Sequence, residues 1–350
     1  MKIITLIISL LLVFLIVSCH NDNPVELTGD MKILSLSQDS VAIGDTLIIK
    51  GEFLGLPDEN LSLVFDSLVS VPSKECLRWH NYEIRVVVPA GSRTGFIKIV
   101  DSLSVKDSMA VKINPVPFFY VVEIPAGKFI RGSITSSVNE MPAKEITITK
   151  PLIISKYEIS QRIYETVTGT NPSRVKALDL PVENVSWKLA IQFCNDLSKL
   201  HNLEEVYTIT GSDAVFNSDK NGWRLPTEAE WEYVCRAGTT TDFSGTGILS
   251  DMGWYGDNSG LKMHPGGQKA ANNFGIYDIH GNVWEWCWDY FSENYYQTSP
   301  VSDPKGPATG DRRVLRGGSW FDGLNFARSS NRTIPENMVG NTGIRIVRNK

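Results

Sequence analysis

Hydrophobic and polar residues alternate along residues 31–114, in short runs separated by turn residues. Leu61–Phe65 shows the alternation, Thr46–Lys50 follows a Gly-Asp turn, and Ile84–Val88 stops at a proline. Successive side chains of a strand point to opposite faces of a sheet, so this period of two predicts β-strands with one buried face. Short strands at regular spacing are typical of a β-sandwich, the fold expected for this part of the chain.

Helical spacing replaces the alternation in two places further along. From Ser186, apolar residues recur at intervals of three and four, as on one face of a helix. A second helix is expected after Pro226, because Thr227 and Glu230 have the spacing of a capping box and Gly238 suits a helix end. The second part of the chain is therefore predicted to be α+β.

Beyond Gly238 the chain is rich in Gly, Asn, Asp and aromatic residues and follows neither period. Backbone groups in such segments need partners if they are buried. Side-chain oxygens of Asn282, Glu285 and Asp289 would suit Ca²⁺. The same oxygens could instead accept hydrogen bonds from nearby amides, and residue chemistry alone leaves both possibilities open.

The first residues form an export signal. Lys2 precedes an apolar run from Ile3 to Val17, which is too short to span a bilayer comfortably. The end of this run, with Ser18 and Cys19, resembles a bacterial lipobox, in which the cysteine is lipidated and becomes the mature N-terminus. We therefore expect a signal peptide over 1–18 and a lipidated tether over 19–30. The alternative is an ordinary secretory signal in which Cys19 is incidental.

Lipidation would attach the mature protein to a membrane without a spanning helix. The expected location is the bacterial cell envelope, and His20, where Asp would favour inner-membrane retention, favours the outer membrane. Which face of that membrane it occupies stays open. A net charge of -5 without a basic cluster gives no sign of nucleic-acid binding.

The remaining cysteines show no metal-binding spacing; they are Cys76, Cys194, Cys235 and Cys287. Four thiols in an exported chain allow two disulfides in three pairings, or none. Buried reduced cysteines are favoured, because two of the four fall on apolar faces of the predicted helices. His280 is likewise expected to be a hydrogen-bonded core group, since no ligand spacing accompanies it.

Residues 31–114 resemble the IPT/TIG immunoglobulin-like domains. The resemblance rests on Gly44–Thr46 before a strand, Gly51 before a turn, and Pro89 between a strand and Gly95. It implies an all-β immunoglobulin-like sandwich, and nothing in the segment looks catalytic, so a spacer or adhesion module is expected. A stiff Pro-containing linker follows, and the second domain is expected over 118–350.

The second domain resembles the formylglycine-generating enzymes, which are the sulfatase-modifying factor family. The resemblance is carried, in family order, by YVVEIPAGKFIRGS (120–133), LPVENVSWKLAIQFCNDLS (180–198), GWRLPTEAEWEYVCRAG (222–238), NNFGIYDIHGNVWEWCWDY (272–290) and LRGGSW (315–320). It implies a variant of the C-type lectin-like fold, with a small antiparallel sheet, two helices and much irregular loop.

The enzymes of this family oxidise a cysteine of a sulfatase to formylglycine with O2 and a copper ion that is held by two cysteines. At the matching positions this chain has Asp322 and Ala327. A carboxylate is a poor ligand for Cu(I), and a methyl group is none. No copper is expected, and the domain is expected to be non-catalytic. The alternative is a divergent oxidoreductase acting on a protein cysteine.

A calcium site of the family matches the run Gly281–Glu285. By this resemblance the expected ligands are Asn282 and Glu285 through side chains, with Gly281 and Val283 through main-chain oxygens. A structural Ca²⁺ ion is therefore expected here.

The matching groove is expected to bind a protein or glycan ligand, or to serve in an envelope assembly. Exposed aromatic residues beside short polar side chains make adaptable binding surfaces, and the segment also resembles the variable region of receptor proteins diversified by retroelements. The alternative is that these aromatic residues only pack the core. The residues predicted to contact the ligand are Trp286, Ser319, Trp320, Phe321, Asp322, Asn325, Phe326, Ser329 and Asn331.

Overall fold

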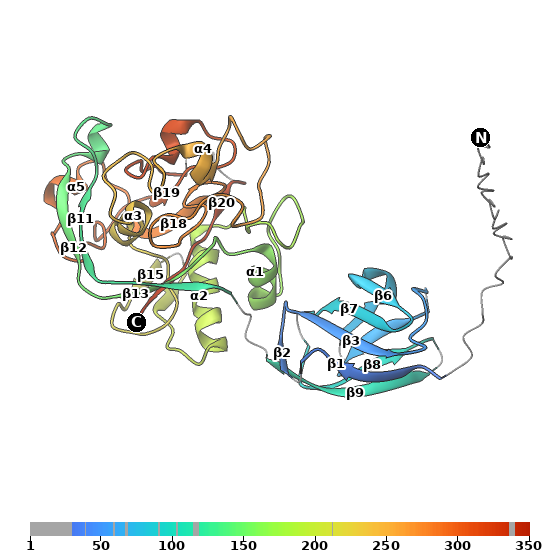
Figure 1. The fold of residues 1–350 in the computed structure, drawn as a ribbon. Coiled ribbons are helices and arrows are strands. Elements are labelled where there is room, and N and C mark those ends of the chain that lie inside the picture. The colour runs from blue at the N-terminus through green and yellow to red at the C-terminus, as the bar shows by residue number, and fades with distance from the viewer. Residues whose placement is uncertain are drawn as a thin grey trace, which may run out of the picture.

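The computed structural model describes residues 30–38, 40–58, 60–66, 69–89, 92–102, 104–114, 119–211, 213–335 and 340–350. The predicted signal peptide, Cys19 and nearly all of the predicted tether lie outside these residues. None of the helices in the described part of the chain has the length and apolar character that crossing a bilayer requires. Two regions are visible in Figure 1, a strand-rich one in blue and teal and a mixed one in green to red.

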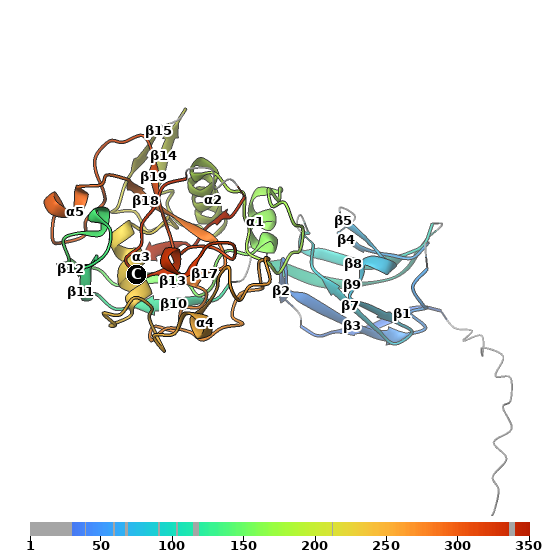
Figure 2. The same cartoon turned by 90° about the horizontal axis from the view of Figure 1, so that it is seen from above.

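The first region consists of strands and one short 3-10 turn, Ser73–Glu75. Its strands are β1 (Lys32–Leu36), β2 (Ser40–Ala42), β3 (Thr46–Glu52), β4 (Ser62–Phe65), β5 (Val69–Pro72), β6 (Arg78–His80), β7 (Glu83–Val87), β8 (Gly95–Val100) and β9 (Val105–Asn114). They form one sheet in the order β1-β3-β7-β6 and another in the order β2-β9-β8-β4-β5. Figure 2 shows these sheets as two layers.

Alternating side chains of both sheets fill the space between the layers. Leu47 and Ile49 of β3 are completely buried, as are Leu63 and Phe65 of β4. All four belong to one apolar cluster. The strands predicted from the period of two are therefore confirmed, and each buries the face that its pattern indicated.

The second region is a mixed α+β arrangement with several small sheets. Its strands are β10 (Val121–Ile124), β11 (Gly127–Arg131), β12 (Lys144–Ile148), β13 (Leu152–Ser155), β14 (Tyr207–Thr210), β15 (Asp213–Phe216), β16 (Gly253–Trp254), β17 (His280–Gly281), β18 (Trp284–Tyr290), β19 (Arg313–Arg316), β20 (Thr342–Gly343) and β21 (Val347–Asn349). Its helices are α1 (Gln161–Thr168), α2 (Trp187–Leu200), α3 (Glu228–Arg236), α4 (Leu249–Met252) and α5 (Tyr295–Thr298).

Both predicted helices are confirmed, as α2 and α3. The hydroxyl of Ser186 accepts from the N–H of Leu189 at the start of α2. At the start of α3, Thr227 and Glu230 form the expected capping box. The chain leaves α3 through Ala237 and Gly238, which both have a positive φ, so the glycine serves the turn that the sequence predicted.

Buried ion pairs hold the irregular segments of the second region together. Arg332 pairs with Glu228 of α3 at 2.7 Å, and Arg316 of β19 pairs with Glu232 one turn later. All four side chains are nearly inaccessible to solvent. Buried charges need such partners, and these pairs join α3 to the segment that follows β19.

Candidate functional site

The segment after β19 begins with a tight turn at two glycines. Gly317 and Gly318 have φ values of 98° and 77°, a region that side chains disfavour. A Cβ atom on Gly318 would lie 3.1 Å from the backbone nitrogen of Ala327. The glycines therefore allow the chain to double back, so that a 3-10 turn over Leu324–Ala327 lies against the start of the segment.

Asp322, at the predicted first copper-ligand position, forms hydrogen bonds within the protein. Its carboxylate accepts from the indole N–H of Trp284 at 2.8 Å and from the hydroxyl of Ser319. Its backbone carbonyl accepts from the N–H of Gly256 at 2.8 Å. Asp322 therefore joins three segments of the chain, as a structural acceptor would.

Ala327, at the predicted second copper-ligand position, is buried. It packs in a small apolar cluster with Phe243 and Leu249. Its carbonyl accepts from Nδ1 of His280 at 2.7 Å, so Nδ1 carries the proton and Nε2 accepts from the hydroxyl of Ser244 at 2.8 Å. Burial lowers the pKa of His280 to about 4, which keeps the imidazole neutral and in its expected role as a core group.

The cysteines in the described part of the chain are free thiols. Cys194, Cys235 and Cys287 are buried, and only Cys76 is half-buried. Burial raises the pKa of Cys235 to about 12. A thiol must ionise to attack a substrate or to bind a metal, so Cys235 is poorly suited to either task.

The predicted ligand-binding residues fall into two groups. Phe321 and Phe326 are 61% and 40% exposed, and Asn325 between them is exposed. Leu324, 44% exposed, belongs with them although the sequence did not single it out. We call Phe321, Leu324, Asn325 and Phe326 the 321–326 surface. Trp320, Asp322 and Asn331 are half-buried.

The other group lies inside the protein, contrary to the prediction. Trp286 is buried and donates its indole N–H to the carbonyl of Val185 at 2.8 Å. Ser329 is buried and donates to the carbonyl of Asp242 at 3.0 Å. Ser319 is also buried and is bound to Asp322 as described above. These three side chains satisfy internal partners and present no surface to a ligand.

The predicted calcium ligands also have protein partners. The carboxylate of Glu285 receives the guanidinium of Arg345 at 2.9 Å and the indole N–H of Trp231 at 2.7 Å. The side-chain oxygen of Asn282 accepts from the N–H of His264 at 3.0 Å. Within the described residues, no group of three or more His, Cys, Asp or Glu side chains could hold a metal ion. Asn282 and Glu285 thus make the hydrogen bonds of the alternative interpretation, and the calcium site stays a prediction.

A buried carboxylate that the sequence did not single out lies close to this run. Asp278 accepts from the N–H of Gly267 at 2.7 Å, but its Oδ1 atom is buried without a partner in the described structure. Burial raises the pKa of Asp278 to about 6. The only sign of this carboxylate in the sequence is its position three residues before Gly281, next to the predicted calcium ligands.

Comparisons with known proteins bear on the second region. Residues 109–350 match the model of the "Sulfatase-modifying factor enzyme 1-like domain". The "Chaperone protein LppX" of Paenibacillus barcinonensis is 32% identical, over 63% of this chain and 87% of its own length. The "Formylglycine-generating enzyme" of Streptomyces coelicolor is 35% identical, over 47% of this chain and 58% of its own length. The solved structure of "Treponema denticola variable protein 1" superposes with a TM-score of 0.61 at 34% identity, over 66% of this chain and 95% of that one.

Proposed function

The chain belongs to the family of sulfatase-modifying factor enzyme 1-like domains, and from this premise we propose that its family domain binds a protein or glycan ligand and does not oxidise cysteine. The observation that carries the proposal is the state of the two copper-ligand positions. Asp322 is occupied by Trp284 and Ser319, and Ala327 is a buried methyl group. Neither offers the thiolate that Cu(I) prefers.

The 321–326 surface supports the binding half of the proposal. Its two phenylalanines and one leucine are exposed although the surrounding loop is firmly hydrogen-bonded. Rigid aromatic area of this kind contributes contact at a low cost in conformational entropy. Similarity to a protein named "variable protein 1" is consistent with a diversified receptor, and sequences of the same gene from sibling isolates would test that by showing whether substitutions concentrate in 320–331.

The rest of the chain would present this domain at the cell envelope. The lipobox resemblance at Cys19 supports a lipid anchor, and His20 at the next position favours the outer membrane. The two sheets of residues 30–114, packed over one core, support an immunoglobulin-like spacer or adhesion module of IPT/TIG type. In this proposal the protein is a lipoprotein whose binding surface is held away from the lipid.

The rival function is a divergent oxidoreductase acting on a protein cysteine, as the name of the Streptomyces coelicolor relative suggests. Two measurements separate the proposals: anaerobic titration with Cu(I) measures copper uptake, and mass spectrometry after aerobic incubation of the copper-treated protein with a cysteine-containing sulfatase peptide and a reductant detects oxidation of the peptide by O2. We expect no stoichiometric copper uptake and an unchanged peptide. The Streptomyces coelicolor enzyme is the positive control. Stoichiometric uptake together with peptide oxidation would overturn the proposal.

Binding is tested on a glycan array and on immobilised outer-membrane proteins. Signals from the native protein should disappear in Phe321→Ala. The matched control is Phe96→Ala, which removes a phenylalanine that is 52% exposed on β8 of the first region. If both variants keep the signals of the native protein, the 321–326 surface is not the binding site.

A further inference from the structure

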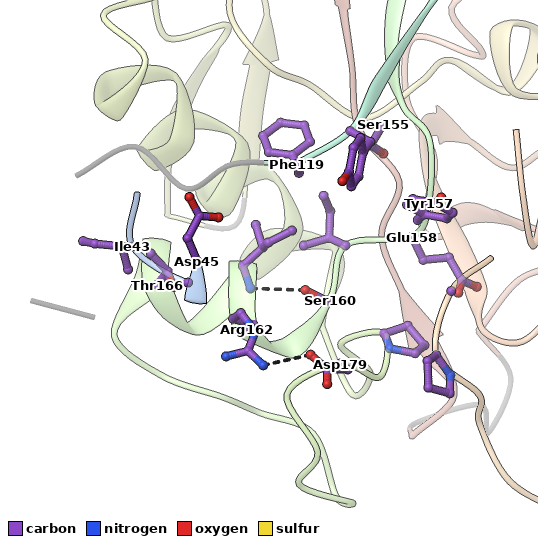
Figure 3. A pocket seen from close by; sticks show the side chains of 17 residues that line it. Ile43, Asp45, Phe119, Ser155, Tyr157, Glu158, Ser160, Arg162, Thr166 and Asp179 are labelled. Atoms are coloured by element: carbon purple, nitrogen blue, oxygen red, sulfur yellow. Dashed lines mark hydrogen bonds and ion pairs between the residues drawn. The ribbon is translucent and has the colours of Figure 1, made fainter. Parts of the chain in front are cut away.

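A cavity of about 310 Å³ lies between the two regions of the protein (Figure 3). Ile43 and Asp45, from the turn between β2 and β3, line one side. Phe119, Tyr157 and Ile163, the last on α1, line the other. We call it the junction cavity. Its volume is at the lower end of the range found for small-molecule sites, which is roughly 300–1,000 Å³.

The two regions are in close contact beside this cavity. Gly44 has a φ of 90°, and a Cβ atom there would lie 3.2 Å from Cδ of Arg162 on α1. The turn therefore rests on the aliphatic part of an arginine side chain. This contact brings the carboxylate of Asp45, from the first region, opposite a wall built by the second.

Apolar and aromatic side chains form most of the cavity wall. Ile159 is buried and Phe119 and Ile163 are partly buried, all of them packed on the main core of the second region. The ring centroids of Tyr157 and Tyr277 lie 5.3 Å apart. Such a wall suits a ligand with a largely apolar body.

Asp45 is the carboxylate that faces this wall without a charged partner among the described residues. Its Oδ2 atom accepts only from the N–H of Ala42, at 3.2 Å. Arg162 is paired with Asp179 at 2.8 Å. In Figure 3 the guanidinium of Arg162 points toward Asp179, while the carboxylate of Asp45 points toward Phe119. The apolar part of the cavity therefore faces one unbalanced negative charge.

Two other charged groups near the cavity do not alter this balance at the wall. Glu158 is buried, and its carboxylate accepts from the side-chain amide of Asn282 at 2.6 Å and from the N–H of Val283 at 3.0 Å, so both of its oxygens already have partners inside the second region. Lys156 does not line the cavity; its ammonium lies 5.7 Å from the ring centroid of Tyr157 and 5.1 Å from that of Tyr277. The protein itself thus already places an ammonium group against these aromatic rings.

We propose that the junction cavity binds a small organic ammonium ion, with its charge near Asp45 and its apolar body against Phe119, Tyr157 and Ile163. Aromatic rings attract such cations through their negative faces, and a carboxylate adds charge complementarity. The site lies apart from the 321–326 surface and does not depend on the function proposed for it. Because the wall comes from both regions, a bound cation would also hold the two regions together.

The test compares choline with dimethylbutanol, its uncharged isostere in which carbon replaces the nitrogen, by calorimetry on the full protein. We expect choline to bind and dimethylbutanol to bind at least about tenfold more weakly. Asp45→Asn keeps an oxygen that can accept from Ala42 but removes the charge, and it should weaken choline binding by about tenfold. The matched control is Asp219→Asn, at a carboxylate that is 90% exposed and outside the cavity.

A second variant guards against misfolding of the first. Thr166→Trp, on the cavity-lining face of α1, should fill the space and abolish choline binding, with an unchanged circular dichroism spectrum. The proposal is wrong if choline does not bind, if the uncharged isostere binds as tightly, or if Asp45→Asn and Asp219→Asn have the same affinity. None of these outcomes affects the tests of the 321–326 surface.

Discussion

Replacing Phe321 by alanine should cost little stability, although it removes a large aromatic side chain. Phe321 is 61% exposed, so only about two-fifths of it is buried. Full burial of a phenylalanine is worth about 1.5–3 kcal/mol, so the loss should be about 1 kcal/mol. Phe243 is the matched control, because it is 9% exposed and packs against Leu249 and Ala327. Truncating a buried phenylalanine costs about 3–5 kcal/mol.

Thermal unfolding followed by tryptophan fluorescence measures both losses. Of the tryptophans, Trp79 alone lies in the first region, so fluorescence reports mainly on the second. For a domain of this size about 1 kcal/mol corresponds to roughly 2–4 °C in Tm. Phe321→Ala should lower Tm by about that much, and Phe243→Ala by at least about three times more. If Phe321→Ala lowers Tm as much as Phe243→Ala, the aromatic residues of the 321–326 surface are packing residues and the binding proposal loses its main support.

Three further predictions concern the interior of the second region. Glu285→Gln leaves Arg345 buried without its anion and should lower the free energy of unfolding in urea by about 3–5 kcal/mol. The control is Glu145→Gln, which removes an ion pair with Lys128 in which both side chains are more than half exposed. This change should cost less than about 1 kcal/mol. Burial, followed by the charge of Glu228, raises the pKa of Asp289 to about 8. The protonated carboxyl therefore stabilises the fold fully below about pH 4, and this contribution to the free energy of unfolding is lost as the pH rises toward 8. Asp289→Asn cannot titrate, so its free energy of unfolding should fall less over this pH range. A calcium ion that binds only the folded protein would stabilise it. If the predicted calcium site is occupied, EDTA should therefore lower Tm, and added calcium should restore it. An unchanged Tm would mean that the predicted ligands only form hydrogen bonds within the protein.

Elements with a clear period could be predicted from the sequence, and those held by distant partners could not. The face of α2 and the capping box of α3 are local patterns, as is the alternation in Leu61–Phe65. The pair between Arg316 and Glu232 joins residues 84 positions apart, and no local pattern reveals it. The short helix α1 was not predicted, although Tyr164 is buried and Ile163 and Val167 pack on the same core at helical spacing; eight residues make only about two turns, too short a run for the period to stand out.

The site shows the same division. Motif order predicts both copper-ligand positions on one segment, and the structure places Asp322 just before the 3-10 turn and Ala327 at its end; their correspondence to copper ligands stays a prediction. Burial of Trp286, Ser319 and Ser329 could not be predicted, because irregular segments have no period that separates inward from outward side chains. Exposure of Leu324 was missed for the same reason, as apolar residues are normally expected inside.

Asp322 and Ala327, at the predicted copper-ligand positions, also explain how the protein's own contacts hold the 321–326 surface in place. Asp322 fixes the start of the 3-10 turn through Trp284 and Gly256. Ala327 fixes its end, because its methyl group is buried and its carbonyl is held by His280. The residues between these two points are directed outward and lose little further entropy when a ligand binds, which is the condition under which exposed aromatic side chains give affinity. The hydrogen bonds of Asp322 and the burial of Ala327 therefore hold the two ends of the turn that exposes these side chains.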